Sequence, residues 1–252
     1  MARFRVGVQV RPQHCEMRQL REAWRAAEEL GADTVFNWDH FFPLDPPADG
    51  EHYECWTMLG AIAADTERVQ FGALVTCNSY RNPDLLADMA RTVDKISGGR
   101  LVLGLGAGWF ERDYTEYGYE FGTAPDRLRA LRAALPRIEA RLARLNPPAP
   151  GIPLLIGGGG EKVTLRITAE RADLWNGFGP PERFAQKNAV LDAWCAEVGR
   201  DPAQIERTVT IGADEVDDFE AYLKAGATHL IMGWDAPFDA KPLQRLIANA
   251  AD

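Results

Sequence analysis

The sequence predicts a single (β/α)8 barrel domain that covers residues 1–252. Short apolar runs alternate with longer amphipathic segments, and eight such strand–helix pairs follow one another. They recur about every 30 residues, and a chain of 252 residues has a length typical of that fold. Strict alternation implies a parallel sheet. An open doubly wound sheet is the rival, but it usually carries a glycine fingerprint after its first strand, which is missing here.

Four strand–helix pairs are expected in the first part of the chain. In the first pair, Leu20, Trp24 and Ala27 recur at helical spacing, and Gly31 follows as a C-cap. In the third pair, Asn82-Pro83 is typical of a helix start, since asparagine caps and proline suits the first turn. The expected strands are 3–10, 33–37, 69–76 and 101–105, and the expected helices are 16–30, 56–65, 82–96 and 126–145.

Four more pairs follow a proline-rich connector at 147–150, which we interpret as a loop rather than a domain boundary. The expected strands are 152–156, 173–176, 205–211 and 228–232, and the expected helices are 161–171, 181–198, 214–225 and 237–250. A parallel barrel gathers its functional groups in the loops that follow the strands. Candidate site residues are therefore sought just past each strand end.

The charge balance disfavours several kinds of partner. The chain carries 37 acidic and 28 basic residues, for a formal net charge of −9. Nucleic acids and anionic membranes need a basic face, so neither is expected as a partner. No apolar stretch reaches the roughly 18 residues of a membrane span, and the start of the chain lacks the apolar region of a signal peptide. We expect a cytoplasmic protein.

Metal and nucleophile chemistry find little support in the sequence. The cysteines, Cys15, Cys55, Cys77 and Cys195, are widely spaced, and the four histidines show no metal-binding pattern, so no metal site is expected. Only two serines occur, and neither lies in a nucleophile elbow. Cys77 lies at a strand end and could act as a nucleophile, but apolar burial is the commoner fate of a free cysteine.

Asp39 and His40 follow the second expected strand, between Trp38 and Phe41. An imidazole titrates near neutral pH, so it can donate or accept a proton beside a carboxylate. The pair is a candidate for acid–base catalysis or for clamping a cofactor. The alternative is structural: Asp39 caps the turn, and His40 packs among the aromatic side chains.

Three alternating glycines follow the fourth strand, at Gly104, Gly106 and Gly108. They would let the backbone approach a flat or charged group, unless they serve tight packing alone. Tryptophans near the strand ends could line a pocket for a planar ring. The alternative is that they pack in the ordinary core. These tryptophans are Trp38, Trp109, Trp175 and Trp234.

Four consecutive glycines follow the fifth strand and precede a helix. Free backbone N–H groups at such a place, together with the helix dipole, form an anion site, and Lys162 could add positive charge. A flexible turn is the alternative, and we favour phosphate binding. The glycines are Gly157, Gly158, Gly159 and Gly160.

Taken together in order and spacing, several segments resemble the luciferase-like monooxygenase superfamily, in particular its branch dependent on the deazaflavin coenzyme F420. The resemblance covers about residues 3–180. The matching pieces are Trp38-Asp39-His40-Phe41, Leu74-Val75-Thr76-Cys77 with Tyr80-Arg81-Asn82-Pro83, Asp94-Lys95-Ile96-Ser97-Gly98-Gly99-Arg100, Gly104-Leu105-Gly106-Ala107-Gly108-Trp109, Ile156-Gly157-Gly158-Gly159-Gly160, Thr164-Leu165-Arg166 and Ala172-Asp173-Leu174-Trp175-Asn176.

The resemblance implies an F420 or FMN ring in the barrel mouth. It places Asp39 and His40 in an acid–histidine pair beside the ring. It also implies a bulge at Leu74-Val75, in relatives often a cis peptide, that supports one face of the ring. The cofactor-binding candidates are Asp39, Leu74, Val75, Thr76, Gly106, Gly157, Gly158, Gly159, Gly160, Lys162 and Trp175, and the catalytic candidates are His40, Asp39 and Glu111.

The chain departs from the family pattern in two places. Some relatives carry an acidic glutamate directly after the strand-four glycines, where this chain has Trp109, so Glu111 is the candidate substitute. The segment between the fourth helix and the fifth strand is also short. A short segment implies a more open site, or a pocket completed by a second subunit in a homodimer.

Three hypotheses follow from these patterns. The first is an F420-dependent oxidoreductase that transfers a hydride between C5 of the deazaflavin and a small organic substrate. The second is an FMN-dependent monooxygenase of the same fold. The third, from another class, is a barrel without a cofactor that acts as a binding subunit.

Overall fold

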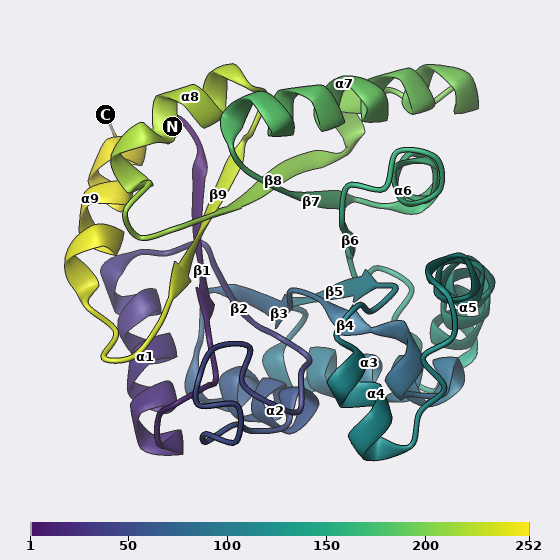
Figure 1. The fold of residues 1–252 in the computed structure, drawn as a ribbon, viewed down its shortest axis with the longest axis horizontal. Coiled ribbons are helices and arrows are strands. Elements are labelled where there is room, and N and C mark those ends of the chain that lie inside the picture. The colour runs from purple at the N-terminus through teal and green to yellow at the C-terminus, as the bar shows by residue number, and fades with distance from the viewer. Residues whose placement is uncertain (1, 252) are drawn as a thin grey trace.

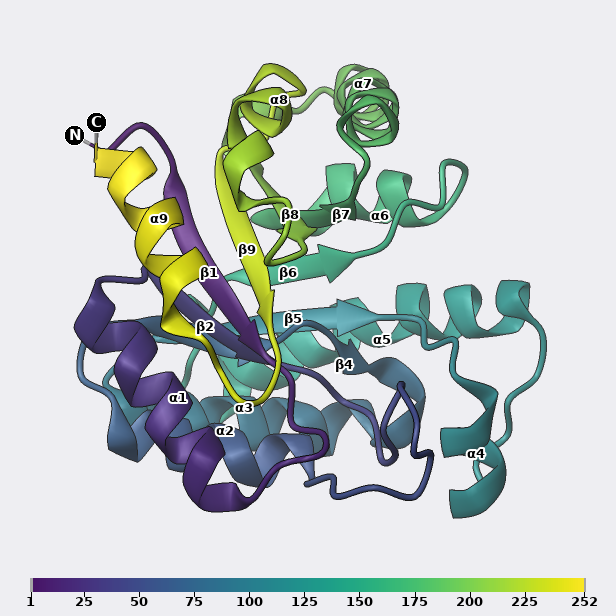
Figure 2. The same cartoon turned by 60° about the vertical axis from the view of Figure 1, so that its left-hand side comes forward.

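The apolar runs of the sequence form the strands of a closed parallel barrel. The computed structural model describes residues 2–251, and Figures 1 and 2 show the strands at the centre with helices around them. The strand order is β3-β2-β1-β9-β8-β7-β6-β5-β4, and an additional pairing of β3 with β5 closes the ring. The strands are β1 (Arg5–Val10), β2 (Thr34–Asn37), β3 (Gln70–Ala73), β4 (Thr76–Cys77), β5 (Leu101–Gly106), β6 (Leu154–Gly157), β7 (Leu174–Phe178), β8 (Glu206–Ile211) and β9 (His229–Trp234).

Closure confirms the predicted (β/α)8 barrel and excludes the open doubly wound sheet. Every strand pair is parallel. Strands β3 and β4 together occupy one position in the ring, so the nine strands within residues 2–251 fill eight positions. The ends of the described chain meet beside β1, where the Arg3 amide donates to the Ala250 carbonyl at 2.8 Å. The same neighbourhood of β1 and the last helix is visible in both views (Figures 1 and 2).

Helices cover the outside of the barrel, and none within residues 2–251 is both long and apolar enough to cross a membrane. The first helix shows how they attach, because Leu20, Trp24 and Ala27 form its buried face, as their spacing predicts. The α-helices are α1 (Met17–Leu30), α2 (Cys55–Asp65), α3 (Pro83–Ser97), α4 (Glu111–Tyr117), α5 (Ala124–Arg144), α6 (Thr164–Arg171), α7 (Pro181–Val198), α8 (Phe219–Lys224) and α9 (Ala240–Ala251), with short 3-10 turns at η1 (Asn78–Tyr80), η2 (Pro202–Gln204) and η3 (Val216–Asp218).

Two layers of apolar side chains hold the barrel together. The larger lies between strands and helices, and the smaller fills the inside of the barrel. A filled interior means that the barrel is a packed core rather than a pore, so a ligand can enter only at a rim. The inner cluster consists of Phe36, Leu74, Val102, Leu155, Leu174 and Ile231.

A bulge separates β3 from β4, although the sequence pattern predicts one strand over 69–76. Strand β3 ends before Leu74, β4 begins after Val75, and the peptide bond between these two residues is cis. Leu74 is anchored to β2 and β1 by hydrogen bonds through its backbone. The Leu74 amide donates to the Asn37 carbonyl at 2.8 Å, and Gln9 Nε2 donates to the Leu74 carbonyl at 2.8 Å.

Two glycines, one in β5 and one in β6, make room for the Val75 side chain. A Cβ at Gly106 would lie 2.6 Å from Val75 Cγ2, and one at Gly157 would lie 2.8 Å from Val75 Cγ1. Real Cβ atoms do not approach so closely, so glycine at both positions is what lets Val75 sit between β5 and β6. The tight-packing interpretation of Gly106 therefore has direct support.

Two local differences from the sequence prediction concern the rim that carries the site. Helix α6 begins at Thr164 rather than at 161, because Glu161 to Val163 form a hydrogen-bonded turn, closed where the Leu165 amide donates to the Gly160 carbonyl. Helix α4 is missing from the prediction. It lies beyond the carboxyl ends of β4 and β5, apart from the ring of outer helices (Figure 2).

Candidate active site

A cavity of about 310 Å³ opens at the carboxyl ends of the strands, where a parallel barrel is expected to carry its site. Most of the predicted site residues line it. The predicted residues in its wall are Asp39, His40, Leu74, Val75, Gly106, Gly157, Gly158, Gly159 and Gly160. Further wall residues are Cys77, Tyr80, Ala107, Gly108, Trp109, Thr164, Asn176 and Phe178.

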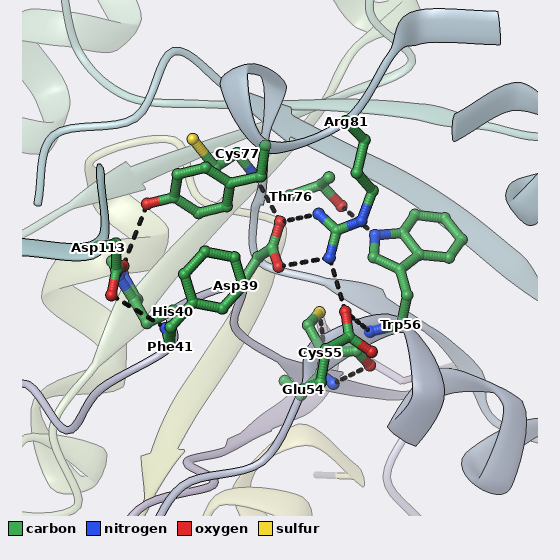
Figure 3. A network of polar contacts seen from close by, with 12 residues as sticks. Asp39, His40, Phe41, Glu54, Cys55, Trp56, Thr76, Cys77, Arg81 and Asp113 are labelled. Atoms are coloured by element: carbon green, nitrogen blue, oxygen red, sulfur yellow. Dashed lines mark hydrogen bonds and ion pairs between the residues drawn. The ribbon is translucent and has the colours of Figure 1, made fainter. Parts of the chain in front are cut away.

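The carboxylate of Asp39 is engaged by an arginine (Figure 3). Arg81 Nη1 donates to Asp39 Oδ2 at 2.6 Å and Nη2 to Oδ1 at 3.0 Å, and the Cys77 amide donates to Oδ2 at 2.9 Å. Burial raises the pKa of the Asp39 carboxyl, while the charge of Arg81 opposes that rise and favours the carboxylate. Arg81 also donates to Glu54 at 2.7 Å. Asp39 therefore ties the loop after β2 to the loop after β4.

His40 has a different carboxylate partner, which the sequence did not reveal. Its Nδ1 lies 2.7 Å from Asp113 Oδ2, and the neighbouring Phe41 amide donates to Asp113 Oδ1 at 3.0 Å. Asp113 lies on α4 and is fully buried, and the Tyr80 hydroxyl donates to it at 3.1 Å. With Nδ1 occupied, Nε2 of His40 is the ring atom available to a ligand in the cavity.

Aromatic rings confine the His40 imidazole. The ring centroids of Trp38, Trp109 and Phe110 lie 5.7, 5.7 and 5.5 Å from that of His40, each at a steep angle. This packing agrees with the structural alternative for His40, and the ring is also paired with a carboxylate. The carboxylate is Asp113 rather than Asp39.

Cys77 fits the burial interpretation better than the nucleophile one. Its Sγ lies 3.1 Å from the Tyr114 hydroxyl, and burial raises the pKa of the thiol above its ordinary value. A raised pKa leaves less thiolate, which is the nucleophilic form. Tyr114 in turn packs against Gly108, where a Cβ would lie 2.0 Å from its hydroxyl.

The tetraglycine run forms an open loop at the edge of the cavity. Gly158 has φ 115°, a left-handed conformation that favours glycine, and its amide donates to the Asn176 carbonyl at 3.1 Å. Within residues 2–251 the amides of Gly159 and Gly160 donate to no other group. Two unengaged N–H groups just before α6 form the kind of concavity that binds anions.

A lysine that the sequence analysis overlooked lies against this loop. A Cβ at Gly159 would lie 3.6 Å from the aliphatic carbons of Lys187, a residue of α7, whose Nζ pairs with Glu161 at 2.7 Å. Lys162, the predicted cation, is exposed and does not line the cavity. Proximity in the fold therefore favours Lys187, which no local sequence pattern connects with the loop.

Three other predicted site residues lie behind or beside the cavity rather than in its wall. Thr76 is buried, and its hydroxyl accepts from Trp56 Nε1 at 3.2 Å. Trp175 is buried, and its Nε1 donates to the Gly158 carbonyl at 2.9 Å, so it supports the glycine loop from below. Glu111 is the first residue of α4 and is exposed, without lining the cavity.

Of the four tryptophans considered as walls for a planar ring, only Trp109 lines the cavity within the described part of the chain. Its side chain is 64% exposed, and Phe178, which sequence reasoning did not single out, is 57% exposed at the same mouth. Trp38, Trp175 and Trp234 are buried. Across residues 2–251, no group of three or more potential metal ligands occurs.

Comparison with known proteins identifies relatives of the whole chain. The family model described as luciferase-like monooxygenase matches residues 1–245. An uncharacterized protein of Mycobacterium tuberculosis is 28% identical over 261 residues, which cover 95% of this chain and 87% of that protein. An F420-dependent glucose-6-phosphate dehydrogenase of Microbacterium testaceum is 28% identical over 220 residues, covering 79% of this chain and 64% of the dehydrogenase.

Solved structures share the fold. An F420-dependent secondary alcohol dehydrogenase, in complex with an F420–acetone adduct, superposes with a TM-score of 0.88 at 17% identity over 99% of this chain and all of that one. A type II Baeyer–Villiger monooxygenase constituent from Pseudomonas putida, in complex with FMN, gives 0.78 at 14% identity over 100% and 98%. The family match over residues 1–245 shows that the chain belongs to the luciferase-like monooxygenase family and is an oxidoreductase.

Proposed function

We propose that this protein is an F420-dependent oxidoreductase that transfers a hydride between C5 of the deazaflavin and a small organic substrate. The observation that carries the proposal is the pair of unengaged amides at Gly159 and Gly160 on the edge of a cavity that also contains His40. The glucose-6-phosphate dehydrogenase and the secondary alcohol dehydrogenase found in the comparisons both use F420.

The residues present fit such a cofactor. The glycine loop leaves a cradle that side chains would fill, and its two amides, with Lys187 beside them, suit an anionic tail. The bulge residues Leu74 and Val75 form an apolar floor on which a flat ring can rest. F420, when bound, supplies the hydride carrier, and the protein's task is to bind, orient and shield it.

His40 is the group we assign to proton exchange with the substrate. Its Nε2 is available at the cavity, and Asp113 at Nδ1 holds the ring in one orientation. Asp39 we assign to positioning, because both of its oxygens are occupied by Arg81. Glu111, the candidate substitute for the missing acid, is too far out on α4 to line the cavity.

A titration with matched glycine variants tests cofactor binding. The intrinsic fluorescence of F420 is followed as protein is added. Gly159→Ala adds a methyl group beside Lys187 on the loop that carries the two amides, and it should weaken F420 binding by about tenfold or more, as expected for the loss of one charge-assisted hydrogen bond. Gly151→Ala is the control, since its Cβ would meet nothing within 4 Å. Equal affinities in the two variants would contradict the assignment of the loop.

The FMN-dependent alternative keeps the same site, and the FMN-bound Baeyer–Villiger enzyme gives it support. Oxygen consumption with reduced FMN, exceeding any F420-linked turnover, would favour it. If the protein is instead a binding subunit without a cofactor, variants of His40 and Gly159 should lose no function.

Two further proposals concern the protein's surroundings. Leu85 and Ile96 on α3 are more than half exposed, and a groove of about 380 Å³ between α2 and α3 includes Trp56 and Met89, so we propose this face for a homodimer. Sedimentation that shows only monomer at micromolar concentration would overturn the homodimer proposal.

All four cysteines are free, which suits the reducing cytoplasm that we propose as the protein's location.

A further inference from the structure

The glycine loop offers an anion three uncharged hydrogen-bond donors. Two are the unengaged amides of Gly159 and Gly160. The third is the Thr164 hydroxyl, because a Cβ at Gly160 would lie 2.7 Å from Thr164 Oγ1, and this oxygen makes no hydrogen bond to other residues within 2–251. Thr164 is only 6% exposed and lines the cavity. Since buried polar groups are normally hydrogen-bonded, its hydroxyl is suited to donate to a ligand.

The charged side chains around this loop leave a net of one positive charge. The aliphatic carbons of Lys187 lie 3.6 Å from the place of a Cβ at Gly159, and its Nζ pairs with Glu161 at 2.7 Å. Lys162, the next residue in the chain, is exposed and adds the second cation. Lys187 reaches the loop because α7 packs beside α6, as Figures 1 and 2 show.

Glu161 places a negative charge next to the anion site. A hydrogen bond from Lys187 is the main reason that the pKa of the Glu161 carboxyl is lower than its ordinary value, so the group is ionised at neutral pH. It directly follows Gly160 in the chain, and its charge therefore repels an anion held by the loop amides. Arg166, the nearby arginine of α6, does not offset this charge, since it pairs with Glu170 at 2.9 Å.

We infer that this charge balance selects the form of the cofactor's phosphate. The loop accepts a singly charged phosphodiester, as in F420, and Glu161 disfavours a doubly charged phosphomonoester, as in FMN. This inference rests on the proposed function. The cost of removing an ion from water rises with the square of its charge, whereas its attraction to a fixed positive charge rises only in proportion. A second negative charge on the phosphate therefore costs more than the loop returns, and Glu161 is a specificity-determining residue.

Two deazaflavins with the same ring provide the test. One is 8-hydroxy-5-deazariboflavin 5′-phosphate, a monoester that carries two charges at about pH 8, and the other is its methyl phosphodiester, which carries one. Fluorescence titrations of the whole protein should show the diester binding at least about threefold more tightly. Glu161→Gln removes one repulsion per ligand charge, so it should tighten the diester about threefold and the monoester about tenfold. Lys187→Met should act in the opposite direction and widen the preference.

Glu197→Gln is the matched control. Glu197 is an exposed glutamate of the same helix as Lys187, about 15 Å further along by the helical rise and so beyond one Debye length. Its replacement should leave both affinities unchanged. Equal binding of the two esters, tighter binding of the monoester, or an equal change for both esters in Glu161→Gln would overturn the inference. Failure of both esters to bind would instead contradict the proposed function, and the inference would fall with it.

Discussion

His40 depends on a residue far from it in the chain. Asp113 holds its Nδ1 at 2.7 Å and also accepts from the Phe41 amide, so one buried carboxylate fixes both the ring and the backbone next to it. Asp39, although adjacent in sequence, pairs with Arg81 instead. Sequence reasoning could select His40 by its place at a strand end. It could not reveal Asp113 as the partner, because this residue lies 73 positions further along the chain and neighbouring loop residues need not point the same way.

Replacing Asp113 with asparagine should separate positioning from binding. Asp113→Asn keeps the shape but removes the charged partner of His40 Nδ1, so we expect kcat to fall by about 10²-fold, within the range of acid–base catalysis. Steady-state kinetics should show this fall, while F420 affinity stays unchanged because the glycine loop is untouched. Unchanged kcat, or an equal loss of kcat and of F420 affinity, would show that Asp113 plays only a structural role.

Replacing Asp39 with asparagine should act mainly on stability. Asp39→Asn leaves the Arg81 guanidinium buried without its main partner, and breaking a buried pair costs about 3–5 kcal/mol. Chemical denaturation should show this loss in the free energy of unfolding. The pH–rate profile of the remaining folded enzyme should keep its shape. A changed profile with unchanged stability would return Asp39 to a direct role in proton transfer.

At the scale of elements, the bulge between β3 and β4 organises the site. Its bulge sends Val75 toward β5 and β6, where Gly106 and Gly157 leave room for it. The apolar pattern of 69–76 alone cannot distinguish a continuous strand from an interrupted one, since the bulge residues are as apolar as strand residues. The family resemblance supplied what the pattern lacked.

A double-mutant cycle can measure this contact. Gly106→Ala should destabilise the protein by about 1–3 kcal/mol, since its methyl group would overlap Val75. Removing the opposing methyl groups in Gly106→Ala/Val75→Ala should recover part of that loss, and thermal unfolding of the four proteins gives the coupling energy. Strictly additive effects would mean that the two side chains do not compete for the same space.

The helices divide into those that the sequence could predict and one that it could not. Long amphipathic segments such as α1 and α3 carry an apolar repeat and clear caps, and the structure places them within a few residues of the prediction. Helix α4 has only seven residues, too few for a repeat to be recognised, yet it supplies Asp113. Short functional helices of this kind need tertiary contacts to form.

At the scale of the whole molecule, the closed barrel brings loops from distant parts of the chain to one rim. Asp39 and His40 follow β2, Trp109 follows β5, and the glycine loop follows β6, yet all line one cavity. The alternation of strands and helices predicts this gathering, because every parallel strand ends at the same rim. The lysine at the loop, Lys187, comes from α7 and could be found only from the fold.

Acid should destabilise the whole fold through a neutral histidine near this rim. Burial lowers the pKa of His52 to about 4, and its Nε2 accepts from Trp38 Nε1 at 2.9 Å, which requires the neutral ring. Because the unfolded chain binds the proton at about pH 6.5, this contribution is complete above that pH. It is lost as the pH falls toward 4, by up to about 3 kcal/mol.

Urea unfolding between pH 7 and pH 4 would measure this loss. His52→Gln, which can still accept from Trp38 without titrating, should show a flatter dependence than the unaltered protein. His229 at the other end of the barrel also has its pKa lowered by burial and should account for part of the slope that remains. Identical slopes in the two proteins would remove His52 from this explanation.

The central claim is that the tetraglycine loop and the bulge together hold F420 over the barrel mouth. A crystal structure of the protein with F420 tests it most directly. The claim predicts a phosphate within hydrogen-bond distance of the Gly159 and Gly160 amides, with the deazaflavin ring resting on Leu74 and Val75. A phosphate bound elsewhere, or a ring outside the cavity of His40, would contradict it.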